Sequence, residues 1–157
     1  MQIGFIIEQP IYKNKESQRI KIIVSACLLG ENCKYNGDNN YCQRVIDFVK
    51  DHNVIPVCPE QMGGLSTPRL PAEISNGKVV NTEGVSVDME YRKGAEAALR
   101  IALEERATHA ILQPRSPSCG CKQVYDGTFS KTLLPGKGVF AQLLADHGIK
   151  LIQPEDI

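Results

Sequence analysis

The sequence predicts an α/β fold, a small doubly wound, Rossmann-like parallel sheet with helices on both faces. Short apolar runs rich in β-branched residues alternate along the chain with longer segments whose apolar residues recur at helical spacing. This alternation is typical of parallel strands that are joined by helical, right-handed crossovers. The length of 157 residues suits one domain of this kind.

Four apolar runs are expected to form the strands, at residues 21–26, 54–57, 109–113 and 149–152. The first run, KIIVSA, is the clearest, because a continuous β-branched run is typical of a strand covered on both faces. The second run, VIPV, is a weaker signal, since Pro56 cannot donate a hydrogen bond to a neighbouring strand.

Three segments between these strands are expected to be helices, at residues 41–52, 88–106 and 137–147. In the first segment, Val45, Ile46 and Val49 recur at helical spacing. Asp88 is expected to be the N-cap of the second helix. Gly148 is expected to be the C′ residue that ends the third helix.

The other segments are expected to be loops and one small β excursion. The excursion lies at residues 74–87, with a turn at Asn76 and Gly77. Loops rich in Gly, Pro or Asn are expected at residues 30–40, 62–72 and 114–136. Residues 1–20 stand outside the pattern and are expected to form an N-terminal arm or an extra strand, so that residues 21–157 form a single domain.

Charge and hydropathy argue against several classes of partner. The 18 basic and 18 acidic residues give a formal net charge of zero. Long-range attraction to a nucleic acid polymer or to an acidic membrane needs a basic excess. No apolar run approaches the ~20 residues of a membrane helix, and the first ten residues lack the basic start of a secretory signal. We therefore expect no membrane, no nucleic acid polymer and a cytoplasmic protein.

The chain has six cysteines, which are Cys27, Cys33, Cys42, Cys58, Cys119 and Cys121. Disulfides are not expected in a cytoplasmic domain of this size. No Cys-x-x-Cys pair is present in the sequence, which disfavours a zinc ribbon or a thioredoxin-like motif. The remaining roles are metal or cluster ligand, reactive nucleophile, or inert buried thiol.

Three of the cysteines are expected to meet at one edge of the sheet. Cys27 and Cys58 directly follow the first two strands, and Cys119 lies a few residues beyond the third. The carboxyl ends of parallel strands share the edge at which ligands bind in doubly wound folds. Thiolates there suit zinc, Cu(I) or an iron–sulfur cluster. Cys33 and Cys42 are expected not to be ligands, whereas Cys121 could be a fourth ligand or a resolving thiol.

Several polar residues are expected near the same edge. Glu60 follows Cys58 by two residues and could transfer protons beside a metal site or simply cap its loop. Ser116 and Ser118 could bind a substrate or cap their turn. Arg69 is expected to form a loop-stabilising salt bridge with Glu73, four residues later; the alternative is that Arg69 binds an anion.

Four blocks of sequence together resemble one known family: SACLLG at 25–30, CPEQMGGLSTPRLPAEI at 58–74, SPSCG at 116–120 and YDGTFS at 125–130. They resemble a bacterial family long catalogued as a domain of unknown function, whose characterised members are thiouracil desulfidases. The resemblance implies a [4Fe-4S] cluster held by Cys27, Cys58 and Cys119. It also implies that Glu60 is the acidic catalytic residue and that Ser116 acts beside it.

The resemblance implies an enzyme that removes sulfur from a small thiolated pyrimidine base or nucleoside, giving the oxo-base and sulfide without a redox step. Flavin or nicotinamide is not expected, and no G-x-G-x-x-G follows the first strand. One alternative is a non-catalytic iron–sulfur module in sulfur handling or sensing. A second alternative is a zinc site that uses Cys121 beside the three strand-end cysteines. Gln113 departs from the lysine common in the family, which affects the choice of substrate more than cluster binding.

Overall fold

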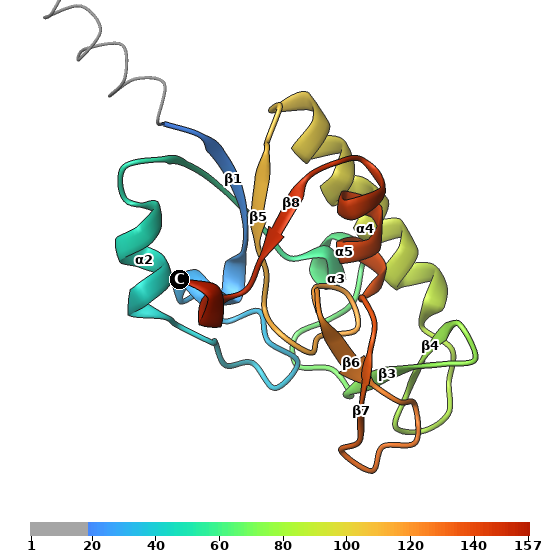
Figure 1. Cartoon of the computed structure of the whole chain (residues 1–157). Helices are drawn as coiled ribbons and strands as arrows, with labels where there is room; N and C mark the ends of the chain where they lie inside the picture. Colours follow the sequence, from blue (N-terminus) through green and yellow to red (C-terminus); the bar gives the residue numbers. More distant parts are fainter. Residues whose placement is uncertain (1–18) are drawn as a thin grey trace, which may run out of the picture.

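A four-stranded parallel sheet forms the centre of the computed structural model, which describes residues 19–157. Its strands are β1 (Lys21–Ser25), β2 (Asn53–Val57), β5 (His109–Ile111) and β8 (Lys150–Ile152). Their order is β2-β1-β5-β8, so β1 lies inside the sheet and the later strands are added on both sides of it (Figure 1). The predicted doubly wound α/β fold is confirmed. The arm or extra strand predicted for residues 1–20 falls almost entirely on residues 1–18, outside the described residues.

Helices cover both faces of the sheet, as Figure 1 shows. The face that carries α2 is opposite the face that carries α4 and α5; these helices are α2 (Gln43–Val49), α4 (Asp88–Glu104) and α5 (Val139–Asp146). Side chains of β1 alternate between the two faces. Ile22 and Val24 are buried against α2, whereas Ile23 is buried against the α4 and α5 side. No helix within residues 19–157 has the length and apolar character needed to span a membrane.

Asp88 is the first residue of α4 and not its N-cap, which is Val87. The Asp88 carboxylate accepts a hydrogen bond from the backbone N–H of Val79 at 3.0 Å and pairs with Arg92 at 2.8 Å. The prediction was wrong because this carboxylate ties the helix to the neighbouring strand instead of capping its own backbone. At the other end of the fold, Gly148 follows α5 with a positive φ of 77°, as predicted for a C′ residue.

Two small hairpins extend beyond the carboxyl end of the sheet and lie side by side (Figure 1). The first pairs β3 (Ala72–Ser75) with β4 (Lys78–Asn81), and it turns at the predicted Asn76 and Gly77. The second pairs β6 (Gln123–Tyr125) with β7 (Leu133–Pro135), within a stretch that was expected to be loop. Its strands have only three residues each, too few for a readable alternation.

Three short helical turns complete the structure. They are η1 (Ala26–Leu29), α3 (Pro59–Met62) and η2 (Pro154–Asp156). The first two follow β1 and β2 directly, so the chain changes direction immediately after each strand. Neither turn was predicted, because four residues carry no helical periodicity.

Candidate active site

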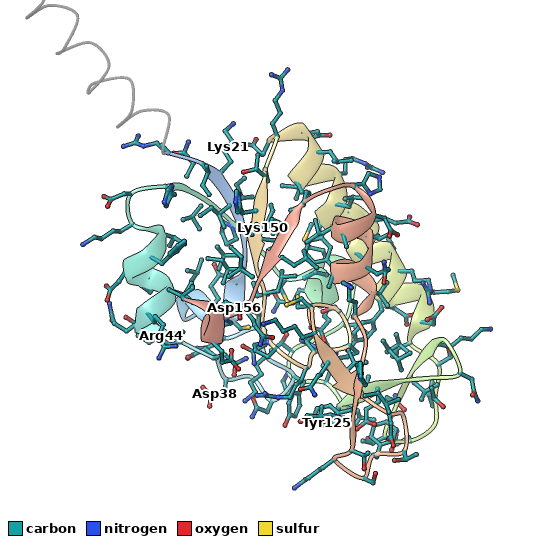
Figure 2. The ribbon with its side chains drawn as sticks, in the orientation of Figure 1. Lys21, Asp38, Arg44, Tyr125, Lys150 and Asp156 are labelled. Carbon is teal, nitrogen blue, oxygen red and sulfur yellow. The ribbon has the colours of Figure 1, made fainter. Side chains whose placement is uncertain are left out.

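A cavity of about 590 Å³ lies at the carboxyl edge of the sheet. Tyr125, one of the residues that line it, lies at the opposite end of the molecule from Lys21, the first residue of β1 (Figure 2). Cys27, Cys58 and Cys119 all line this cavity. The structure therefore brings together the three thiols that the sequence placed at the ends of three strands.

Local structure fixes the position of each of these cysteines. Cys27 lies in η1, and its carbonyl oxygen accepts N–H bonds from Gly30 and Asn40. Cys58 is the extended residue that precedes α3. The backbone N–H of Cys119 donates to Oγ of Ser116 at 3.0 Å. Each cysteine is thus positioned by the segment that follows its strand.

Cys33 is a fourth thiol in the same cavity; the sequence predicts only that it is not a ligand. Hydrogen bonding from Cys33 lowers the pKa of Cys27, and it lowers the pKa of Cys58 to about 7. The pKa of Cys33 itself is raised by the same contacts. The loop that follows η1 returns to the cavity, so a thiol six residues after Cys27 can reach it. The short distance between Cys33 and Cys27 in the sequence was the signal that could have predicted Cys33 in the cavity.

The other two cysteines lie elsewhere. Cys42 is the N-cap residue of α2 and does not line the cavity. Cys121 donates from Sγ to Oε1 of Gln153 at 3.9 Å and does not line it either. Burial raises the pKa of Cys121. The zinc alternative, which needs Cys121 beside the strand-end cysteines, gains no support from this placement.

Glu60 lies on α3 and lines the cavity beside the thiols. Its Oε1 accepts a hydrogen bond from the hydroxyl of Tyr91 at 2.7 Å and faces the Nη2 of Arg69 at 3.6 Å. Its Oε2 accepts a longer bond from Oγ of Ser118 at 3.3 Å. The carboxylate is thus held on both oxygens, mostly by buried side chains.

Arg69 pairs with Glu60, and the predicted salt bridge between Arg69 and Glu73 is absent from the described residues. The Arg69 guanidinium turns inward and donates to the carbonyl oxygen of Cys33 at 2.8 Å. Glu73 instead accepts backbone N–H bonds from Gly127 and Phe129, each at 3.0 Å. The prediction was wrong because the loop buries Arg69, while Glu73 joins the two hairpins.

The two serines form a directed hydrogen-bond chain that ends at Glu60. Oγ of Ser116 accepts N–H bonds from Ser118 at 3.1 Å and from Cys119 at 3.0 Å, so both of its lone pairs are occupied. Its proton is then directed to Oγ of Ser118, which is 3.1 Å away. The Ser118 proton is left to reach the Glu60 carboxylate, a stronger acceptor than the Cys119 thiol 3.6 Å away.

Tyr91 was not singled out from the sequence. It lies on the buried face of α4 with Ala95, Ala98 and Ala102, and only 2% of its surface is exposed. A tyrosine in a stripe of alanines was a usable signal, because a buried phenol needs a hydrogen-bond partner.

The donor set fits a cluster better than a single metal ion. Within residues 19–157, no three Cys, His, Asp or Glu side chains converge as ligands of one ion. The cysteine ligands of a [4Fe-4S] cluster bind different irons, so their thiols surround a space instead of meeting at a point. Cys27, Cys58 and Cys119 reach one cavity from three separate loops, an arrangement that suits ligands of different irons.

The family model of 2-thiouracil desulfurase matches residues 22–156. The chain belongs to the 2-thiouracil desulfurase family. A solved structure of the [4Fe-4S]-dependent thiouracil desulfidase TudS is similar to this family member, with a TM-score of 0.83 and 37% identity over 88% of this chain and 93% of that one. The YbbK protein of Bacillus subtilis (strain 168) is 38% identical over 146 residues, which cover 87% of this chain and 97% of YbbK.

Proposed function

We propose that this protein is a desulfidase that removes sulfur from a small thiolated pyrimidine base or nucleoside. The observation that carries the proposal is one cavity lined by three strand-end thiols and the Glu60 carboxylate. Family membership and the likeness to TudS, a [4Fe-4S]-dependent thiouracil desulfidase, support it. A cavity of about 590 Å³ also lies within the size range of small-molecule sites.

Cys27, Cys58 and Cys119 would hold the [4Fe-4S] cluster. When bound, the cluster supplies a Lewis-acidic iron that polarises the thiocarbonyl group of the substrate. The thiols must lose their protons to bind iron. Cys58 meets this need most easily, because the hydrogen bond from Cys33 lowers its pKa to about 7. Cys119 meets it least easily, because burial raises its pKa.

Glu60 acts as the general base in this proposal. Its carboxylate accepts a proton from water, and the water oxygen attacks the thiocarbonyl carbon. The C–S bond then breaks, so that thiocarbonyl and water give carbonyl and hydrogen sulfide. Atoms and electrons balance without an oxidant or a reductant. The guanidinium of Arg69, whose side chain is 6% exposed, offsets the cost of burying the carboxylate charge.

The test is anaerobic reconstitution with iron and sulfide, followed by incubation with 2-thiouracil, 4-thiouracil and the matching nucleosides. We expect sulfide and the oxo-base in equal amounts, and no dependence on an added electron donor. Absence of sulfide with all four substrates, from protein with full iron content, would overturn the proposal. It would favour the alternative of a non-catalytic iron–sulfur module in sulfur handling or sensing, since such a module has no need of Glu60.

A small-molecule substrate, and neither a nucleic acid polymer nor a membrane, is part of the same proposal. The zero net charge supports it, because binding to a polyanion needs a basic excess. A cytoplasmic location is proposed for a related reason. Partly exposed thiols such as Cys27 and Cys58 stay reduced more readily in that compartment.

A further inference from the structure

We infer that Tyr91 is a positioning residue for Glu60, which holds Oε1 of the carboxylate and leaves Oε2 to take the proton of the attacking water. This inference rests on the proposed function. It adds that the two carboxylate oxygens have different roles, and that Tyr91 on α4 determines which oxygen has which role.

The distances distinguish the two oxygens of Glu60. Oε1 has a short bond from the Tyr91 hydroxyl, at 2.7 Å, and the positive charge of Arg69 at 3.6 Å. Oε2 has the bond from Ser118 at 3.3 Å, which is long for a hydroxyl donor to a carboxylate. A proton added to Oε1 would be repelled by the Tyr91 hydroxyl proton and by the positive charge of the Arg69 guanidinium. A proton added to Oε2 displaces only the weakest of the three contacts.

Tyr91 is suited to a fixed donor and not to proton transfer. Burial raises the pKa of its hydroxyl, and the neighbouring Glu60 charge raises it further. The phenol therefore keeps its proton and serves Glu60 only as a donor. Its ring has no freedom to turn away, because just 2% of the residue is exposed.

The packing of α4 against α3 fixes the distance between these two residues. Tyr91 lies one helical turn before Gly94 on α4, and the backbone of Gly94 contacts that of Pro59, the residue before Glu60. The hydroxyl and the carboxylate are thus carried by two helices whose backbones touch. This arrangement orients Glu60 before substrate arrives.

The test is Tyr91→Phe, which removes the hydroxyl and keeps the ring. We expect the kcat of sulfide release to fall roughly 10- to 100-fold, the range of a lost hydrogen bond to a charged group. Iron content should stay at the parent level, and KM should change less than about twofold because the hydroxyl serves the base and not the substrate. The matched control is Tyr41→Phe, an exposed tyrosine outside the cavity lining, which should leave kcat unchanged.

A double-mutant cycle separates positioning from general support of the fold. In a Glu60→Gln background the base is already absent, so Tyr91→Phe should lower kcat no further. If the two losses multiply, or if Tyr91→Phe raises KM and spares kcat, the inference is wrong while the proposed function stands.

A second cycle tests the contact in cluster-free protein, where no activity is needed. Tyr91→Phe and Glu60→Ala should show non-additive effects on the urea midpoint of unfolding, because each removes the same hydrogen bond. Additive effects would overturn the inference even if the parent protein released no sulfide. Failure of the parent protein to release sulfide counts against the proposed function instead.

Discussion

Gly94 of α4 lies so close to Pro59 that a Cβ atom on Gly94 would stand 1.7 Å from the Pro59 carbonyl oxygen. The same close approach is found from the side of α3. A Cβ atom on Gly63, the C-cap residue of α3, would lie 1.9 Å from the carbonyl oxygen of Glu90 on α4. Pro59 stands between Cys58 and Glu60 in the chain. The long helix α4 therefore sets the position of a cluster-ligand candidate and of the general-base candidate together.

Gly94→Ala should damage both stability and the site. Although alanine favours a helix by about 1 kcal/mol over glycine, its methyl group would push α3 away from α4. Overpacking of this kind costs about 1–3 kcal/mol or more, so we expect a net loss of stability in urea unfolding. Gly136→Ala is the control, since its new Cβ would only reach ordinary contact with Val124, at 3.5 Å. Equal urea midpoints of unfolding for the two variants would show that α3 can move away from α4 without loss of stability.

Glu60→Gln should keep the cluster and lose the reaction. Glutamine has nearly the same shape, and Glu60 is not proposed as a ligand, so iron content should match the parent protein. Turnover of a thiouracil-type substrate should fall about 10²- to 10⁴-fold, the usual effect of removing a proton-transfer group. Sulfide release and iron are measured on the same anaerobic sample. Parent-level rates with full iron would remove Glu60 from the mechanism.

Ser116→Ala should act mainly on the loop that carries Cys119. The hydroxyl of Ser116 accepts two backbone N–H bonds, and its loss leaves both donors without this partner. We expect a loss of about 1–3 kcal/mol in the free energy of unfolding of cluster-free protein, and a smaller fall in turnover than for Glu60→Gln. The exposed Ser130→Ala is the control and should change stability by less than about 0.5 kcal/mol. A Ser116→Ala variant as stable as the control would contradict the capping role.

Sequence alone predicted the central sheet, its helices and the meeting of the strand-end thiols, for one physical reason. Parallel strands such as β1 are buried on both faces and read as continuous apolar runs, and their carboxyl ends must share an edge. The topology alone therefore places any residue that directly follows such a strand at this edge of the sheet. This is why Cys27 and Cys58 could be assigned to one cleft.

The contacts around Glu60 could not be predicted in the same way. Arg69 reaches Glu60 through a loop without periodicity, and its choice between Glu60 and Glu73 depends on which way that loop folds. Tyr91 reaches Glu60 because two helices touch at glycines, a tertiary contact that no local pattern encodes. Cys33 enters the cavity because its loop returns across the end of β1, and loop paths depend on packing more than on propensity.

Cys33→Ser and Cys42→Ser should both retain iron near the parent level. Cys42 lies at the start of α2, away from the cavity. Cys33 lies in the cavity, but the serine hydroxyl can replace its S–H as a donor to a neighbouring thiolate. Cys27→Ser, made in parallel, should lose most of its iron. Iron loss in Cys33→Ser comparable to that in Cys27→Ser would make Cys33 a ligand.

The pKa of Cys58 makes a separate prediction for cluster-free, reduced protein. Only the thiolate is alkylated by iodoacetamide. The pKa of about 7, against the usual 9.0, means that Cys58 should react half-maximally near pH 7, slowly below that pH and fully above it. Cys119 should stay unreactive throughout this range, because burial raises its pKa and also shields the sulfur.

Cys33→Ala tests the cause of that low pKa. The hydrogen bond from Cys33 is the largest influence that lowers the pKa of Cys58, so its removal should move the pKa back toward 9.0. At pH 7 the thiolate fraction would then fall from about one half to roughly 1% at the limit. Because thiolates of higher pKa are stronger nucleophiles, the alkylation rate should fall less, by about tenfold. The rate at Cys58 is followed by mass spectrometry of the labelled peptide between pH 6 and 9, where Cys33→Ser should keep most of the parent's reactivity. An unchanged pH midpoint in Cys33→Ala would mean that the backbone N–H of Gln61 and the charge of Arg69 suffice to stabilise the Cys58 thiolate.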